Sequence, residues 1–329
     1  MRIVYMGTPE IAAGVLREVI DLSKERDLEI VGVYTQPDKP VGRKQILTPS
    51  PVKVLALENG LDVYQPVRIK RPKPTEVLRS LQPDLILVTA FGQILSQEIL
   101  DIPPLGCINM HASLLPEYRG AAPIQWSIVD GKQETGVTAM QMDAGIDTGD
   151  MILRERVAIE PEETADTLYD KLTLAGARVI REVLERLLRG EELLRTPQDP
   201  EKATYAAMIK KEDGCILWNS PAHRIDCQVR GFAGWPGTYS FLRSGEDREG
   251  AKCGILKVRL PRDVEDQGLE TGCVYSKLLE GKHPRLVVQT GDGPLEITML
   301  QPSCKKAMET EAYLRGTREL PSRFTDTAE

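Results

Sequence analysis

The chain has 329 residues, of which 41% are hydrophobic and 28% are charged, and its formal net charge is −7 at pH 7. A single hydrophobic core rarely extends over so many residues, so two domains are expected. The acidic balance argues against a protein that coats nucleic acid through overall positive charge, but it is compatible with a local basic track. No apolar run has transmembrane length, and the N-terminus lacks a basic region followed by an apolar segment. We therefore expect a cytoplasmic protein without a membrane partner. A monomer is expected as well.

The first 190 residues alternate between apolar runs and segments with helical features. Buried strands are predicted at residues 2–6, 30–35, 84–89 and 106–111, and alternating strands at residues 134–142 and 151–157. Helices are predicted after Pro9, after Ser50 and after Thr164. Strands that alternate with helices predict an α/β fold, with a Rossmann-like, doubly wound and mostly parallel sheet.

One segment of this half has no strand or helix pattern. Residues 36–51 (QPDKPVGRKQILTPSP) are rich in proline and basic side chains. They predict a long loop, and long loops in compact domains are often functional.

The second half of the chain has a different sequence pattern. Residues 190–208 are polar and contain prolines, which is typical of a linker. The short apolar runs that follow are separated by glycine and proline turns, as in GWPGTYSFL and GILKVRL, and they predict a small OB-like β-barrel. We expect a catalytic domain at residues 1–190, a linker at 191–208 and a β-barrel domain at 209–329.

The first strand–helix turn does not have a nucleotide-binding motif. It reads MGTPEIAAG, with one glycine where a dinucleotide fold would show GxGxxG, and the chain contains no GxxxxGK[ST]. The fold still predicts a crevice at the carboxyl ends of the parallel strands.

Asn109 and His111 lie at such a strand end. Their spacing of two places both side chains on one face of the strand and Met110 on the other. An amide that donates a hydrogen bond and an imidazole that handles a proton suit an addition to a carbonyl group. A polar strand end that is satisfied by loop backbone explains the same residues equally well.

Asp147 belongs to an acidic turn, MDAGIDTGDM, at residues 142–151. Aspartate and glycine are ordinary turn residues, and the spacing does not match an EF-hand loop. Taken alone, this segment predicts a turn more readily than a catalytic group.

The cysteines and histidines do not predict a metal site. The six cysteines include no CxxC pair, and the three histidines are far apart in the sequence. Cys107 lies beside Asn109, but cysteine is commonly buried, so a packed strand residue is expected there rather than a nucleophile.

Four segments together resemble the N10-formyltetrahydrofolate-dependent formyltransferases, and the resemblance covers nearly the whole chain. They are residues 36–54 (QPDKPVGRKQILTPSPVKV), 106–125 (GCINMHASLLPEYRGAAPIQ), 135–151 (TGVTAMQMDAGIDTGDM) and 298–308 (TMLQPSCKKAM). One departure is Ala112, where the family commonly has glycine. The first and last segments are similar to those of members that act on methionyl-tRNA.

The resemblance implies a reaction and a role for each polar residue. The formyl group of N10-formyltetrahydrofolate would pass to the α-amine of methionine esterified to initiator tRNA. Asn109 and protonated His111 would stabilise the tetrahedral oxyanion. Asp147 would orient His111 and help to move a proton from the attacking to the leaving nitrogen. No covalent enzyme intermediate and no metal is implied.

The resemblance also implies where the two substrates bind. The candidate folate residues are Phe91, Gln93, Ile94, Leu95, Ser113, Leu114, Leu115, Pro116, Met140, Gln141 and Asp143. The candidate tRNA residues are Lys39, Arg43, Lys44, Lys305 and Lys306. Without the resemblance, core packing would explain the apolar residues and solvation would explain the basic ones.

Two other functions stay open. The catalytic half would also fit a formyltransferase that acts on a small amine, or a formyltetrahydrofolate hydrolase. A non-catalytic RNA-binding protein could use the β-barrel, but it would leave the polar strand end with Asn109 and His111 unexplained.

Overall fold

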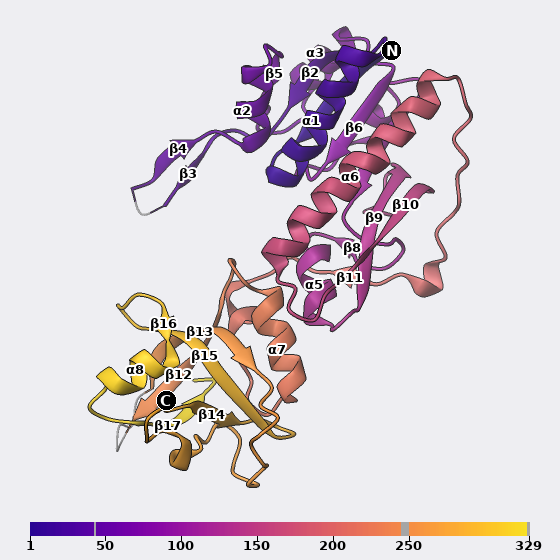
Figure 1. Cartoon of the computed structure of the whole chain (residues 1–329). Coiled ribbons are helices and arrows are strands. Elements are labelled where there is room, and N and C mark those ends of the chain that lie inside the picture. Colours follow the sequence, from indigo (N-terminus) through magenta and orange to yellow (C-terminus); the bar gives the residue numbers. More distant parts are fainter. Residues whose placement is uncertain (43, 245–249, 328–329) are drawn as a thin grey trace. The chain divides into compact units, whose positions relative to one another are not determined.

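The computed structural model describes residues 1–42, 44–244 and 250–327, which form two compact units (Figure 1). Unit 1 comprises Met1–Pro123, Glu134–Ala158 and Leu168–Ala207, and unit 2 comprises Ile124–Gln133, Ile159–Thr167 and Met208–Glu329. Within the described ranges, no helix combines the length and the apolar character needed to cross a membrane.

Unit 1 is built on a seven-stranded sheet in the order β10-β9-β7-β6-β1-β2-β5. The strands are β1 Arg2–Gly7, β2 Glu29–Tyr34, β5 Val63–Tyr64, β6 Leu85–Thr89, β7 Cys107–His111, β9 Glu134–Gln141 and β10 Met151–Ala158. The pairs from β7 to β5 are parallel, whereas β9 runs antiparallel to both β7 and β10. The predicted Rossmann-like, mostly parallel sheet is confirmed.

Helices cover both faces of this sheet. They are α1 Glu10–Glu25, α2 Pro51–Glu58, α3 Pro72–Ser80, α4 Gln97–Leu100 and α6 Ala165–Leu188, the last from Leu168 onward in unit 1. Helix α2 begins as predicted, because the Ser50 hydroxyl accepts a hydrogen bond from the Lys53 backbone N–H at 3.1 Å. Helices α3 and α4 were not predicted. Prolines near the start of α3 look like loop signals in the sequence, although the first helical turn tolerates proline.

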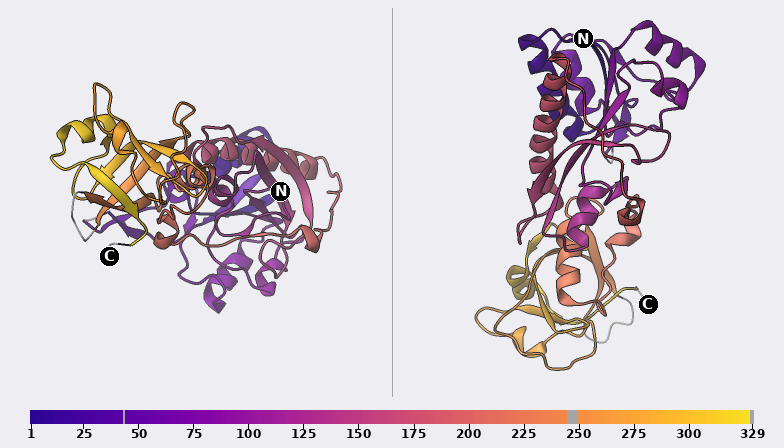
Figure 2. Two further views of the ribbon diagram at one scale, coloured as in Figure 1. Left: turned by 90° about the horizontal axis from the view of Figure 1, so that it is seen from below. Right: turned by 90° about the vertical axis from the view of Figure 1, so that its right-hand side faces the viewer.

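Helices α1 and α6 lie together along one face (Figure 2). Gly14 permits this close approach, since a Cβ there would lie 2.2 Å from Cγ2 of Thr173. Helix α6 also packs on β7, where a Cβ on Gly176 would lie 2.8 Å from the Met110 side chain. Cys107, on the other face of β7, joins a buried cluster with residues of α3 and α4. Asn109 and His111 share that second face, away from α6.

The segment predicted as a long loop is a short hairpin. β3 (Lys39–Val41) pairs antiparallel with β4 (Ile46–Thr48). An ion pair between Asp38 and Lys53, 2.7 Å from Oδ2 to Nζ, holds its base. The prediction of a loop was wrong because these strands have only three residues each and contain or adjoin prolines. Edge strands tolerate a proline.

Unit 2 contains an antiparallel, barrel-like sheet of six strands. These are β12 Thr238–Ser244, β13 Ala251–Arg259, β14 Leu286–Gln289, β15 Pro294–Pro302, β16 Met308–Glu309 and β17 Pro321–Thr325. Helices α7 (Ala222–Gly231) and α8 (Thr310–Gly316), which were not predicted, contribute Ile225 and Leu314 to its core. The predicted barrel-like C-terminal fold is confirmed.

Candidate active site

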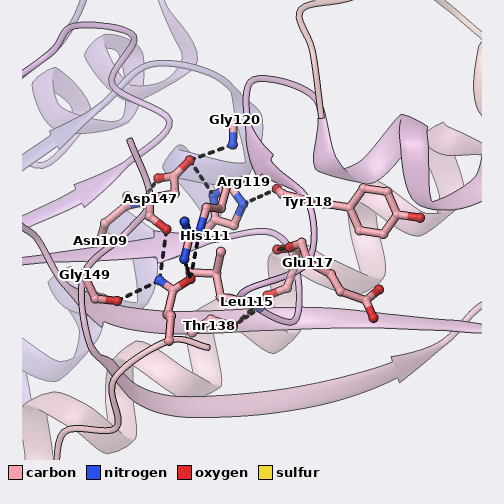
Figure 3. A network of polar contacts seen from close by, with 12 residues as sticks. Asn109, His111, Leu115, Glu117, Tyr118, Arg119, Gly120, Thr138, Asp147 and Gly149 are labelled. Carbon is pink, nitrogen blue, oxygen red and sulfur yellow. Dashed lines mark hydrogen bonds and ion pairs between the residues drawn. The ribbon is translucent and has the colours of Figure 1, made fainter. Parts of the chain in front are cut away.

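The candidate site begins at the carboxyl end of β7. Asn109 and His111 are 8% and 6% exposed, so both side chains are removed from bulk water. They lie on one face of the strand, as their spacing predicts (Figure 3). Two polar groups buried side by side require partners from other elements.

Asp147 supplies the first of these partners from the turn between β9 and β10. Its Oδ1 lies 3.5 Å from Nδ2 of Asn109, and its Oδ2 lies 3.6 Å from Nδ1 of His111. The backbone N–H of Gly120 donates to the same Oδ2 at 2.9 Å. The three side chains singled out in the sequence therefore converge, with the carboxylate of Asp147 facing both neighbours (Figure 3).

The turn that carries Asp147 is tightly constrained. Asp147 has a φ of +54°, a left-handed conformation that is uncommon outside glycine and often found at functional sites. The Asp143 carboxylate accepts hydrogen bonds from the Gly145 N–H and the Thr148 hydroxyl across the turn. A Cβ on Gly149 would lie 1.7 Å from the Gln141 carbonyl oxygen, so no larger residue fits there. This backbone holds the carboxylate in place.

The hydrogen bond of His111 to Tyr118 defines which ring nitrogen carries a hydrogen. Its Nε2 lies 2.8 Å from the carbonyl oxygen of Tyr118. A carbonyl oxygen only accepts, so Nε2 carries a hydrogen. Nδ1 then faces the Asp147 carboxylate, and a hydrogen on this nitrogen makes that contact favourable as well. A ring with a hydrogen on each nitrogen would satisfy both contacts.

Sequence reasoning missed two further side chains of this network. Arg119, 7% exposed, donates from Nε and Nη2 to Oε1 of Gln198 at 3.0 and 2.8 Å. Nε2 of Gln198 donates to the carbonyl oxygens of Asp147 and Gly149 at 2.9 and 2.7 Å. Gln198 lies in the segment expected to be a linker, where a lone polar residue gives no signal.

That segment runs along unit 1 near the site. Thr196 and Met151 exchange two backbone hydrogen bonds of 2.9 Å. Strand β11 (Tyr205–Ala206) pairs in parallel with β8 (Arg119–Gly120). These backbone contacts place Gln198 beside the Asp147 turn.

Cys107 has none of the features of a nucleophile. It is 1% exposed, and burial raises the pKa of its thiol to about 12. The thiol form therefore dominates at neutral pH, and only a thiolate attacks readily. Among the described residues, no three histidine, cysteine or acidic side chains gather closely enough to hold a metal ion.

The candidate folate residues divide into buried and accessible groups. Phe91 and Leu95 belong to the cluster that contains Cys107, and Leu115 and Met140 form a small cluster with Met151. Gln93 bonds to backbone, since its Oε1 accepts from the Ile69 N–H and its Nε2 donates to the Pro66 carbonyl.

The remaining candidates lie around these clusters. Ser113 is buried and donates to the Glu117 carbonyl oxygen at 2.6 Å. Gln141 donates to the Cys107 carbonyl oxygen, and its Oε1 is buried without a partner among the described residues. Ile94 is 71% exposed, and Leu114, Pro116 and Asp143 are partly or fully exposed.

The candidate tRNA residues lie on exposed segments. Lys39 is in β3 and Lys44 is in the turn before β4, while Arg43 lies outside the described residues. Val41, Ile46 and Leu47 of this hairpin are 56%, 62% and 68% exposed. Lys305 and Lys306, in unit 2, are exposed in the turn between β15 and β16.

Comparison with protein families identifies the chain. A model described as "Formyl transferase" matches residues 1–184, and one described as "Formyl transferase, C-terminal domain" matches residues 208–318. The chain belongs to the formyltransferase family. Relatives named methionyl-tRNA formyltransferase include one from Geobacter sulfurreducens, 44% identical over 98% of this chain and 95% of the relative. Another, from Geotalea daltonii, is 46% identical over 96% of this chain and 95% of the relative.

Solved formyltransferase structures share this fold. A sugar 3N-formyl transferase crystallised with dTDP and 5-N-formyl-THF superposes with a TM-score of 0.65 at 19% identity, over 93% of this chain and 99% of that one. An N-formyltransferase from Helicobacter canadensis, in complex with folinic acid and dTDP-3-aminofucose, gives a TM-score of 0.64 at 19% identity, over 91% and 98% of the two chains. At this identity the likeness concerns the fold alone.

Proposed function

We propose that this formyltransferase moves the formyl group of N10-formyltetrahydrofolate to the α-amine of methionyl initiator tRNA. The observation that carries the proposal is the contact of the Asp147 carboxylate with both Asn109 and His111. Relatives at 44–46% identity, aligned over nearly the full chain, are named methionyl-tRNA formyltransferase. The product would be formylmethionyl-tRNA for the initiation of translation.

The addition step uses Asn109 and His111. The lone pair of the methionyl amine attacks the formyl carbon, and the carbonyl oxygen becomes an oxyanion. Asn109 has two N–H hydrogens and only a long contact of 3.5 Å to Asp147, so it retains a donor for this oxyanion. His111 supplies positive charge, because its ring nitrogens already face the Tyr118 carbonyl and Asp147.

The collapse step needs a proton on the leaving nitrogen. After addition the attacking nitrogen is positively charged, and N10 of the folate must gain a proton before its bond to the formyl carbon breaks. Asp147 is 16% exposed in its side chain, so it is within reach of both water and the buried pair. We assign to it the relay of this proton from one nitrogen to the other, directly or through water. The products are a formamide and tetrahydrofolate.

The folate would lie along the residues at the carboxyl ends of β6 and β9. Gln141, half-buried at the end of β9, would border the folate ring. The backbone near Phe91 and the apolar side chains of Ile94 and Leu114 would complete the wall of this site. Phe91, Leu95, Leu115 and Met140 would act mainly by shaping it, because they are buried.

The tRNA would be held by basic residues on both units. Lys39 and Lys44 on the hairpin, together with Arg43, would contact phosphates or bases of the acceptor end. Lys305 and Lys306 would provide a second set of phosphate contacts. The expected division into a catalytic domain, a linker and a tRNA-binding domain, and action as a cytoplasmic monomer, are part of this proposal.

The test compares amine substrates at a fixed concentration of N10-formyltetrahydrofolate. The proposal expects formylation of methionyl initiator tRNA at a kcat/KM that exceeds that for free methionine and dTDP-linked amino sugars by several orders of magnitude. Preference for a small amine would replace the tRNA assignment while keeping formyl transfer. Release of formate without an acceptor would indicate a hydrolase.

A further inference from the structure

Gln198 links the segment of Arg119 to the turn that carries Asp147 and Gly149, and it does not touch the reacting groups. Its Oε1 accepts from Nε and Nη2 of Arg119, and its Nε2 donates to the carbonyl oxygens of Asp147 and Gly149. All four heavy-atom distances lie between 2.7 and 3.0 Å. The side chain therefore uses both ends of its amide.

The orientation of this amide is determined by chemistry. A guanidinium only donates hydrogen bonds, so the atom facing Arg119 must be the oxygen. Backbone carbonyls only accept, so the atom facing Asp147 and Gly149 must be the nitrogen. An amide is the one common side-chain group that offers an acceptor at one end and two donors at the other.

These bonds form a closed network around Asp147. Gln198 holds the carbonyl of Asp147, while Gly120, the neighbour of Arg119, donates its N–H to the Asp147 carboxylate. Tyr118, on the other side of Arg119, accepts from His111. The segment 118–120 thus contacts both members of the His111–Asp147 pair, and Gln198 ties it to the turn.

The closed network holds two residues in backbone conformations that would otherwise be disfavoured. Asp147 has φ +54° and Tyr118 has φ +58°, and non-glycine residues in this region persist where surrounding bonds fix them. Gln198 contacts the carbonyl of Asp147 itself and that of Gly149, two residues on. Loss of these two bonds frees the turn to relax, which moves the carboxylate relative to Nδ1 of His111.

We propose that Gln198 is a positioning residue for Asp147 in formyl transfer, acting through the carbonyls of Asp147 and Gly149 and anchored by Arg119. The inference rests on the proposed function for its kinetic part only. Its geometric part, the placement of the Asp147 carboxylate against His111, is measurable without substrate.

The decisive variant is Gln198→Glu. Glutamate has nearly the same shape, and its carboxylate still accepts from Arg119, with the added attraction of opposite charges. It has no N–H for the carbonyls of Asp147 and Gly149, so these two bonds are lost and an oxygen faces each carbonyl. If Gln198 only anchored its segment to Arg119, Gln198→Glu would keep the wild-type kcat. If Gln198 positions Asp147, the substitution lowers kcat. Gln133→Glu, at an exposed glutamine, is the matched control for the change of charge.

The first readout separates turnover from binding. Displacements of about 1 Å at a reacting group lower rates by as much as ~100-fold. We expect Gln198→Glu to lower kcat by on the order of 10- to 100-fold, to leave the KM for tRNA nearly unchanged, and to melt close to the wild-type temperature. The Gln133→Glu control should match the wild type in all three.

The second readout is the ring of His111 in the full-length protein. The chain has three histidines, so ¹⁵N-labelled imidazole resonances can be assigned by single substitutions. We expect the Nδ1 resonance of His111 to move in Gln198→Glu while those of His223 and His283 stay in place. This result does not depend on which amine is the substrate.

The third readout is a double-mutant cycle with Asp147→Asn. A residue that acts through the Asp147 carboxylate should lose most of its effect once that carboxylate is gone. Gln198→Glu is therefore expected to change kcat by less than about threefold in the Asp147→Asn background.

Two results would overturn the proposal. One is a Gln198→Glu enzyme with wild-type kcat and an unmoved His111 resonance. The other is a kcat loss of equal size in the Asp147→Asn background, which would indicate a role independent of the carboxylate. If Gln198→Glu folds poorly, Gln198→Met, of similar length and without charge, goes through the His111 resonance and double-mutant readouts with the same expectations; it also removes the acceptor for Arg119, so a lower melting temperature is expected. A wild-type enzyme that does not formylate methionyl-tRNA would refute the proposed function, while the His111 resonance still decides the role of Gln198.

Discussion

The contact between Asp147 and His111 predicts a large effect of Asp147→Asn on turnover. The substitution keeps the size of the side chain, and the asparagine oxygen can still accept from the Gly120 N–H. It removes the negative charge 3.6 Å from Nδ1 of His111 and directs an N–H at the amide of Asn109. The variant should therefore fold and pack like the wild type, but its site lacks the negative charge of the carboxylate.

The structure gives the size of this effect. Two unit charges 3.6 Å apart attract by about 5 kcal/mol at an effective dielectric constant of about 20. Desolvation of the largely buried pair offsets part of that attraction. In the transition state the carboxylate also relays the proton between the two nitrogens, and loss of such a group lowers the rate by on the order of 100-fold or more. The bond to the Gly120 N–H is retained, so the variant should still fold.

Single-turnover formylation measures this rate without interference from product release. Wild type, Asp147→Asn and the surface control Asp21→Asn are mixed in excess with charged initiator tRNA and labelled formyl donor, and the reaction is quenched over time. Asp21 is an exposed residue of α1, with a side chain 52% exposed. A rate for Asp147→Asn within about threefold of the wild type would refute the assignment of the carboxylate to the chemistry.

Three other substitutions test separate parts of the account. His111→Ala should lower kcat by at least ~100-fold. It should also lower the free energy of unfolding by about 1–2 kcal/mol, because a buried hydrogen bond to the Tyr118 carbonyl is lost. Kinetics and urea titration measure the two effects, and complete unfolding would point to a purely structural residue. Arg43→Ala should raise the KM for tRNA and reduce its dependence on salt while the KM for the folate stays constant; equal effects on both substrates would contradict its role. Gly149→Ala should lower both stability and kcat, since its Cβ would meet the Gln141 carbonyl oxygen at 1.7 Å; a variant with wild-type urea midpoint would show that the turn yields easily.

The longer strands of unit 1 (β1, β2, β6, β7, β9 and β10) and the first pair of site residues could be predicted because they depend on local pattern. The runs IVYM in β1 and LILV in β6 are apolar throughout, which is typical of strands buried on both faces. The spacing of Asn109 and His111 fixes their common face through the period of two in a strand. Composition and periodicity are sufficient for these features.

The rest of the site depends on tertiary structure. Asp147 lies 36 positions beyond His111 in the sequence, and in its acidic turn it is one of several aspartates. Its role was suggested by family resemblance, and its contact with Asn109 and His111 appears only when β9 pairs with β7. Gln198 had no signal at all, because a glutamine in a polar, proline-containing segment looks like any solvated residue.

The hairpin shows a different limit of sequence reasoning. Strands β3 and β4 have three residues each and contain or adjoin prolines, so neither length nor alternation distinguishes them from a loop. Their exposure of Val41, Ile46 and Leu47 is also opposite to the usual expectation that such residues are buried. Both features follow from pairing within a projecting segment.

Product analysis after a single incubation tests formyl transfer to methionyl-tRNA directly. The full-length protein, N10-formyltetrahydrofolate and charged initiator methionyl-tRNA are combined, and the amino acid released from the tRNA is identified by mass spectrometry. Formylmethionine from the wild type, and little or none from Asp147→Asn over the same time, is the expected result. Unmodified methionine from the wild type, with an active and intact folate donor, would contradict the account.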